Sequence, residues 1–96
     1  MEQLKELKKF CENHKVLKPL WKELVKASLR LRIIQSEIAL ALGIESKELF
    51  LKKQHEYQKR NQKYASAFSE FKRKCKKLGV KVPSFSHEEV CDLYID

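Results

Sequence analysis

The sequence is short of the residues that turns require, because its 96 positions include only two glycines and two prolines. Sandwiches and barrels reverse direction about every 8–12 residues and need turn residues each time, so an all-β fold is excluded. A chain of this length forms one domain at most. The scarcity of turn residues therefore predicts a single all-α domain over residues 1–96.

Residues able to carry out chemistry are also scarce, since the chain has three histidines and three cysteines. His14, His55 and His87 belong to three separate segments, and none has a cysteine or aspartate at the spacing of a nucleophile and its base. Cys91 follows His87 by four positions, but a zinc site needs further ligands. A glycine-rich phosphate loop is missing as well. We therefore expect no catalytic site, no metal and no cofactor, and hence no enzyme.

Long hydrophobic runs and a secretion signal are missing too. The most apolar stretch, residues 29–44, includes two arginines, a glutamine and a glutamate, and it is too short to cross a bilayer. The odd number of cysteines, together with the missing signal, favours reduced thiols in the cytoplasm or the nucleus. Cys11 and Cys75 fall in apolar stripes, where a cysteine serves as a small hydrophobic residue.

The chain does contain apolar residues at helical spacing. Steps of three and four positions predict four helices, which span about residues 2–13, 18–42, 47–78 and 87–95. We expect Gly43 to end the second helix in a left-handed conformation, Gly79 to close the third, and Ser46 to cap the start of the third. Residues 86–89 match the capping box Ser-x-x-Glu. Residues 80–85 alternate between apolar and polar, which predicts an extended segment laid over the bundle.

The third predicted helix carries the clearest pattern, a packing seam with an apolar side chain every seven positions. With one aromatic companion, the seam residues are Phe50, Tyr57, Tyr64, Phe68, Phe71 and Leu78. Such a repeat is typical of coiled coils, so we predict a long antiparallel hairpin of the second and third helices, on which both short helices pack. The spacing favours a core role for Tyr57 and Tyr64 over stacking on bases. Gln54 and Asn61 flank the seam, either buried or hydrated at its edge.

The second predicted helix is apolar over a wider face than one partner helix can cover. Beside its own seven-residue repeat, a second apolar stripe contains Val25, Leu29, Ile33 and Leu40. A face this broad indicates at least two neighbours. We therefore predict a homodimer that completes a helical bundle, or docking on a partner protein. On this interpretation, the chain is a protein-interaction, regulatory or assembly module.

Charge is distributed unevenly along the chain, whose net charge is +8. Residues 45–81 hold twelve lysines and arginines against four acidic residues, whereas residues 82–96 hold four acidic residues and no lysine or arginine. The cations that we consider for polyanion binding fall in two clusters along the third helix. The first contains Lys52, Lys53, Lys59 and Arg60, and the second contains Lys72, Arg73, Lys74, Lys76 and Lys77. The alternative function is therefore binding to the phosphate backbone of nucleic acid. Two simpler interpretations remain, a solvated basic face or an acidic tail folded back on the second cluster.

One short stretch of sequence gives the nucleic-acid alternative further support. Residues 35–53 resemble the helix-turn-helix family, with Ala39 at the tight helix contact, Gly43 at the turn and Leu49 as a later core residue. The resemblance implies that residues 46–53 face the major groove of DNA. The stretch departs from the family in two ways, since the preceding helix is much longer than a first motif helix and Lys52 stands where an apolar residue is expected.

Overall fold

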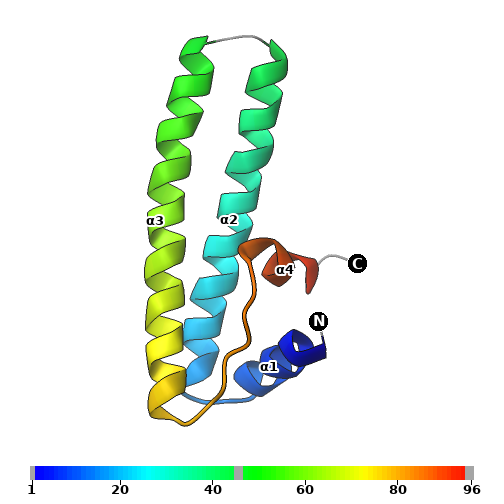
Figure 1. Cartoon of the computed structure of the whole chain (residues 1–96), viewed down its shortest axis with the longest axis vertical. Helices are drawn as coiled ribbons and strands as arrows, with labels where there is room; N and C mark the ends of the chain where they lie inside the picture. The colour runs from blue at the N-terminus through cyan, green and yellow to red at the C-terminus, as the bar shows by residue number, and fades with distance from the viewer. Residues whose placement is uncertain (1, 45–46, 95–96) are drawn as a thin grey trace.

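A computed structural model shows a hairpin of two long helices with a short helix at each end of the chain (Figure 1). It describes residues 2–44 and 47–94, which contain four helices and no strand. The predicted all-α fold, a long antiparallel hairpin with short terminal helices, is confirmed. The helices are α1 (Glu2–Glu12), α2 (Leu17–Ile44), α3 (Lys47–Lys77) and α4 (His87–Asp92).

The first helix turns into the second through a side-chain cap. His14 Nδ1 accepts hydrogen bonds from the backbone N–H groups of Val16 and Leu17, both at 3.2 Å. These N–H groups have no partner inside the helix, so the imidazole satisfies donors that the first turn leaves open. Pro19 follows in that first turn, where its missing N–H costs nothing. As a result, α2 begins at Leu17, one residue earlier than predicted.

Three contacts fix the register of the hairpin from one end toward the other. The rings of Trp21 and Phe71 lie 5.6 Å apart, and Arg60 Nη1 donates to the carbonyl oxygen of Arg30 at 3.0 Å. Further along, Lys53 Nζ lies 3.3 Å from a carboxylate oxygen of Glu37. Because α2 and α3 stay in contact over this whole distance, the molecule is long and narrow, with extents of 48 × 26 × 19 Å.

The main hydrophobic core lies where α2 begins and α3 ends. Eight buried residues from three helices form it: Leu4, Leu7, Cys11, Leu17, Trp21, Leu24, Phe71 and Cys75. The segment after α3 crosses this end of the hairpin, as Figure 1 shows. Its Val80, Val82 and Phe85 pack against the core, which confirms the predicted extended segment.

Gly79 closes α3 as predicted, through a Schellman motif. Gly79 has a φ of 73°, and its N–H donates to Lys76 O at 3.2 Å. The N–H of Val80 donates to Cys75 O at 2.8 Å. This pair of bonds satisfies carbonyls that the helix end leaves open, and the left-handed conformation costs a glycine little.

Gly43 departs from the prediction, because it lies inside α2 and has no positive φ. The described part of α2 continues to Ile44, and a glycine fits an ordinary helical conformation as well as a left-handed one. The predicted cap at Ser46 lies outside the described residues.

Side-chain hydrogen bonds stabilise the last helix at its start and just beyond its end. Ser86 and Glu89 form the predicted capping box, in which the Ser86 hydroxyl accepts from the N–H of Glu89 at 3.3 Å. Beyond α4, the indole N–H of Trp21 donates to the hydroxyl of Tyr94 at 2.7 Å. The helix itself ends at Asp92, three residues earlier than predicted.

The helix-turn-helix interpretation is not supported by this geometry. In that family the two helices meet at a steep angle of about 90–120°. Here α2 and α3 run side by side for their whole length (Figure 1), so the start of α3 is not presented as a separate recognition helix. Within residues 2–44 and 47–94, no helix combines the length and the hydrophobicity needed to cross a membrane.

Candidate interaction surfaces

Of the seam residues of α3, Phe71 alone is fully buried. Tyr64 and Phe68 are half-buried and pack against the core. Toward the far end, Tyr57 and Phe50 are half-buried without belonging to that core. The seam therefore exists along the whole hairpin, but only one end of it is closed over.

One predicted member of the seam differs in the structure, and one open question about its flanking amides is answered. Leu78 is 43% exposed, because α3 ends at Lys77 and Leu78 already belongs to the turn that follows. Gln54 is half-buried and Asn61 is exposed, so the amides lie at a hydrated edge of the seam.

The uncovered end carries large apolar side chains in contact with solvent. Its most exposed members are Leu40 at 68%, Leu42 at 60% and Leu51 at 58%. Along the second stripe of α2, Val25 packs against the core and Leu29 is half-buried, but Ile33 and Leu40 are exposed. The stripe thus starts under the core and continues into solvent.

A groove of about 940 Å³ runs between α2 and α3, and only these two helices line it. Its floor contains the small residues Ala27 and Ala67, both half-buried, and Leu20. Charged side chains stand along both edges, among them Glu23, Lys26, Arg30, Lys59, Lys63 and Glu70. Neither α1 nor α4 contributes to the lining, so this face of the hairpin is bare.

The first predicted cationic cluster is partly neutralised within the chain. Lys53 pairs with Glu37, and Arg60 Nε lies 3.0 Å from a carboxylate oxygen of Glu56. The hydrogen bond from Arg60 lowers the pKa of the Glu56 carboxyl below its usual value. Only Lys52 and Lys59 of this cluster remain exposed.

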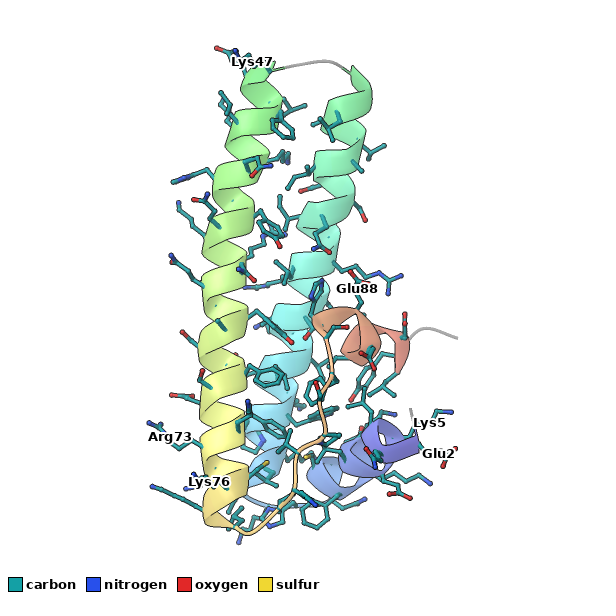
Figure 2. All side chains as sticks on the ribbon, viewed as in Figure 1. Glu2, Lys5, Lys47, Arg73, Lys76 and Glu88 are labelled. Atoms are coloured by element: carbon teal, nitrogen blue, oxygen red, sulfur yellow. The ribbon has the colours of Figure 1, made fainter. Side chains whose placement is uncertain are left out.

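The second predicted cluster is free of such pairs. Arg73, Lys76 and Lys77 are exposed at the end of α3, and Figure 2 shows Arg73 projecting away from α2. Lys74 is half-buried, and Lys72 Nζ lies 5.2 Å from the centre of the Phe68 ring. None of the ion pairs formed by the described residues includes this cluster.

The fold adds cations that the sequence reasoning missed. Because the hairpin is antiparallel, the start of α2 lies beside the end of α3. The exposed Lys18 and Lys22 belong to that start, and the exposed Lys15 belongs to the turn that precedes it. The predicted hairpin already implied this meeting of the two ends. We call Lys15, Lys18, Lys22 and the five cations at 72–77 the basic end.

The acidic tail does not cover the basic end. Asp92 pairs instead with Arg32 at 3.2 Å, and Glu89 serves in the capping box of α4. The Asp92–Arg32 contact holds α4 near the middle of α2, well away from the end of α3 (Figure 1). Within the described part of the tail, fold-back onto the cluster is therefore excluded.

The three cysteine side chains are buried packing residues. Burial raises the pKa of Cys11 to about 12 and raises the pKa values of Cys75 and Cys91. Thiols with raised pKa values are poor nucleophiles. His87 Nε2 lies 3.0 Å from Gln35 Oε1, an ordinary packing contact between α4 and α2. Across the described ranges, no group of three histidine, cysteine or acidic side chains is placed to hold a metal ion.

The geometry defines a structural class but no particular chemical activity. The described residues form an all-helical hairpin with a hydrophobic core at one end, and no other segment covers its groove or its far end. The chain matches no protein-family model, no curated protein and no solved structure.

Proposed function

We propose that the protein is a non-enzymatic helical interaction module that associates with itself and docks on a partner protein. The observation that carries the proposal is the unfinished packing of the hairpin, where Ile33, Leu40, Leu42 and Leu51 are each more than half exposed.

Physical considerations support a partner for this surface. A helix that is apolar over a broad face gains stability by covering that face, at about 25 cal/mol per Å² of apolar area removed from water. The core at the closed end leaves these side chains uncovered, although each belongs to a helix that packs well elsewhere. A second helical layer would complete a bundle of the usual kind.

Sedimentation velocity over a range of protein concentrations tests the proposal. The unmodified protein should associate as its concentration rises, and the double variant Ile33→Lys/Leu40→Lys should stay monomeric. Val16→Lys is the matched control, because Val16 is 42% exposed but lies at the other end of the hairpin. A protein that remains monomeric up to high concentration contradicts self-association.

A second candidate, binding to the phosphate backbone of nucleic acid, is favoured by one observation. The basic end brings together cations from two helices without an acidic partner among the described residues. Lysines that meet phosphates release condensed counterions, so the affinity falls steeply as salt rises.

Anisotropy titrations of a labelled DNA duplex and a labelled single-stranded RNA, at low and moderate salt, test this candidate. The variant Lys76→Glu/Lys77→Glu should weaken binding and flatten its salt dependence, because each lost contact lowers the slope by about 0.9 on the duplex and by about 0.7 on the single strand. The control Lys47→Glu/Lys52→Glu makes the same change of charge at the other end of α3. Absence of binding at low salt rejects the candidate.

A further inference from the structure

The bare groove is electrically polar along its length. At the end nearest the core, Glu23 and Glu70 stand on opposite edges, both exposed. At the other end stand Arg30 and Lys59, also exposed, beside the ion pair of Arg60 with Glu56. The groove therefore has an acidic end near the core and a net positive end away from the core.

This polarity has a centre that is shared by both helices. Glu23 and Arg30 lie equally far from the midpoint between residues 26 and 27 of α2, and Glu70 and Lys59 lie equally far from the midpoint between residues 64 and 65 of α3. The Trp21–Phe71 and Arg30–Arg60 contacts on either side place these two midpoints at the same level of the hairpin. A two-fold axis that runs across the groove at that level exchanges the acidic end of the groove with its net positive end.

We infer that two copies of this chain pack groove to groove in antiparallel orientation, as an isologous four-helix bundle. This inference rests on the proposed self-association and names its surface and its geometry. In this arrangement α2 lies on α2 and α3 on α3 of the second copy, each pair antiparallel, and the two-fold axis makes every contact occur twice.

The register that follows pairs opposite charges. Glu23 faces Arg30 of the second copy, and Glu70 faces Lys59 of the second copy. Lys26 and Lys63, which lie close to the axis, face the small side chains of Ala27 and Ser66. Because they lie close to the axis, Lys26 and Lys63 also come near their own counterparts on the second copy, so their long side chains turn outward and keep the ammonium groups in solvent.

The same register gives an apolar partner to an exposed side chain. Ile33, which is 55% exposed and lies seven positions after Lys26 on the same side of α2, comes opposite Leu20 of the second copy. Leu20 lines the groove and is half-buried in the monomer. Two such contacts close the ends of the interface over the alanine floor.

The parallel arrangement is disfavoured by the same charges. It places α2 on α3 of the second copy with equal ends together, so that Glu23 meets Glu70 and Arg30 meets Lys59. Like charges across an interface weaken the wrong arrangement, while exposed opposite charges mainly set orientation and contribute little affinity each. The charge pattern therefore selects the antiparallel dimer.

Charge exchange between two variants tests the inference. Glu23→Arg/Glu70→Lys and Arg30→Glu/Lys59→Glu each place like charges together, and each should weaken homodimerisation at least tenfold in sedimentation at low salt. A one-to-one mixture of the two should recover the dimer, because all four kinds of contact are then opposite in sign. Lys18→Glu/Lys22→Glu, outside the groove, is the control and should dimerise like the unmodified protein.

A distance measurement tests the orientation separately. Nitroxide labels on Lys47→Cys, at the tip of the hairpin in Figure 2, lie about 50 Å apart in the antiparallel dimer, from 1.5 Å per helical residue on each side of the axis. A short distance between the labels overturns the inference. So does a dimer that ignores the charge reversals, or a mixture that stays as weak as its components, and in both cases self-association itself survives. A monomeric unmodified protein instead rejects the proposed function.

Discussion

The two ends of one hairpin differ more than their sequences suggest. Near the core, α2 and α3 are covered by α1, by the segment 78–86 and by α4, and Trp21 and Phe71 are buried. We call this the covered half, residues 17–35 and 58–77. In the open half, residues 36–44 and 47–57, the same two helices have only each other, and Leu40, Leu42 and Leu51 are exposed.

The difference teaches that a heptad repeat fixes the direction of a packing seam but not how completely it is buried. Phe50 and Phe71 occupy equivalent positions of one repeat, yet Phe50 is half-buried and Phe71 is fully buried. Burial depends on what lies over the seam, and the terminal segments reach only one end. The open half and the bare groove face of the covered half are therefore the surfaces available for a partner.

The largest expected effect compares these two phenylalanines directly. Phe71→Ala should lower the free energy of unfolding by about 3–5 kcal/mol, because it leaves a cavity in a closed core. Phe50→Ala should cost about 1–2 kcal/mol, because part of the Phe50 side chain is already in contact with water in the folded protein. Urea denaturation at low protein concentration measures both. Equal costs would mean that the open half is as well packed as the covered half.

Alkaline pH should weaken the covered half through its thiols. The pKa of Cys11 is raised from 9.0 to about 12 by burial, so the unfolded chain loses this proton first as the pH rises. Stability from the buried thiol is complete below pH 9 and is lost between pH 9 and about 12, with a slope of at most about 1.4 kcal/mol per pH unit. Denaturation midpoints at pH 8, 9 and 10 should therefore fall.

The matched control for that experiment is Cys11→Ala, which should show a smaller decline between pH 9 and 10 from its own lower starting stability. An unchanged decline would assign the alkaline sensitivity to other groups.

A hydroxyl in each half gives a smaller effect. Tyr94→Phe removes the acceptor of the Trp21 indole N–H and should cost about 1 kcal/mol, the usual worth of such a bond. Tyr57→Phe is the matched change in the open half, where the structure gives the hydroxyl no hydrogen bond, so its cost should be near zero. Thermal denaturation followed by Trp21 fluorescence compares the two, and a larger loss for Tyr57→Phe would contradict the assignment.

The smallest effect is expected at the tip of the hairpin. Leu40→Gln should change the stability of the monomer by no more than about 0.5 kcal/mol, as exposed substitutions usually do. The same change at the buried Leu24 should be severely destabilising. A substantial loss of stability for Leu40→Gln at low concentration would show that Leu40 already has a partner within the monomer.

Much of the fold could be predicted from the sequence, because its signals are local. Apolar spacing located the four helices, Gly79 fixed the end of α3, and Ser86 with Glu89 located the start of α4. The prediction that Gly43 ends α2 was wrong for a local reason too, because a glycine permits a left-handed turn without requiring one.

The candidate surfaces were less predictable, because they depend on long-range packing. The sequence grouped the cations by position, but it could not show that Glu37 on α2 would pair with Lys53 on α3. The Glu56–Arg60 pair has the spacing i, i+4 of one helix and could have been predicted. It also gave no sign that α4 would be held by Arg32 instead of the basic end. The open groove is a property of where the terminal segments lie, and no repeat within α2 or α3 records that.

Hydrogen exchange resolved along α2, at a concentration where the protein is monomeric, tests the central claim most directly. Protection reports the free energy of local opening, which ranges from near zero to the full stability of the protein. The account predicts that amides in residues 21–31 exchange only through global unfolding, while amides in residues 37–43 exchange many times faster. Uniform protection from Trp21 to Gly43 would contradict it.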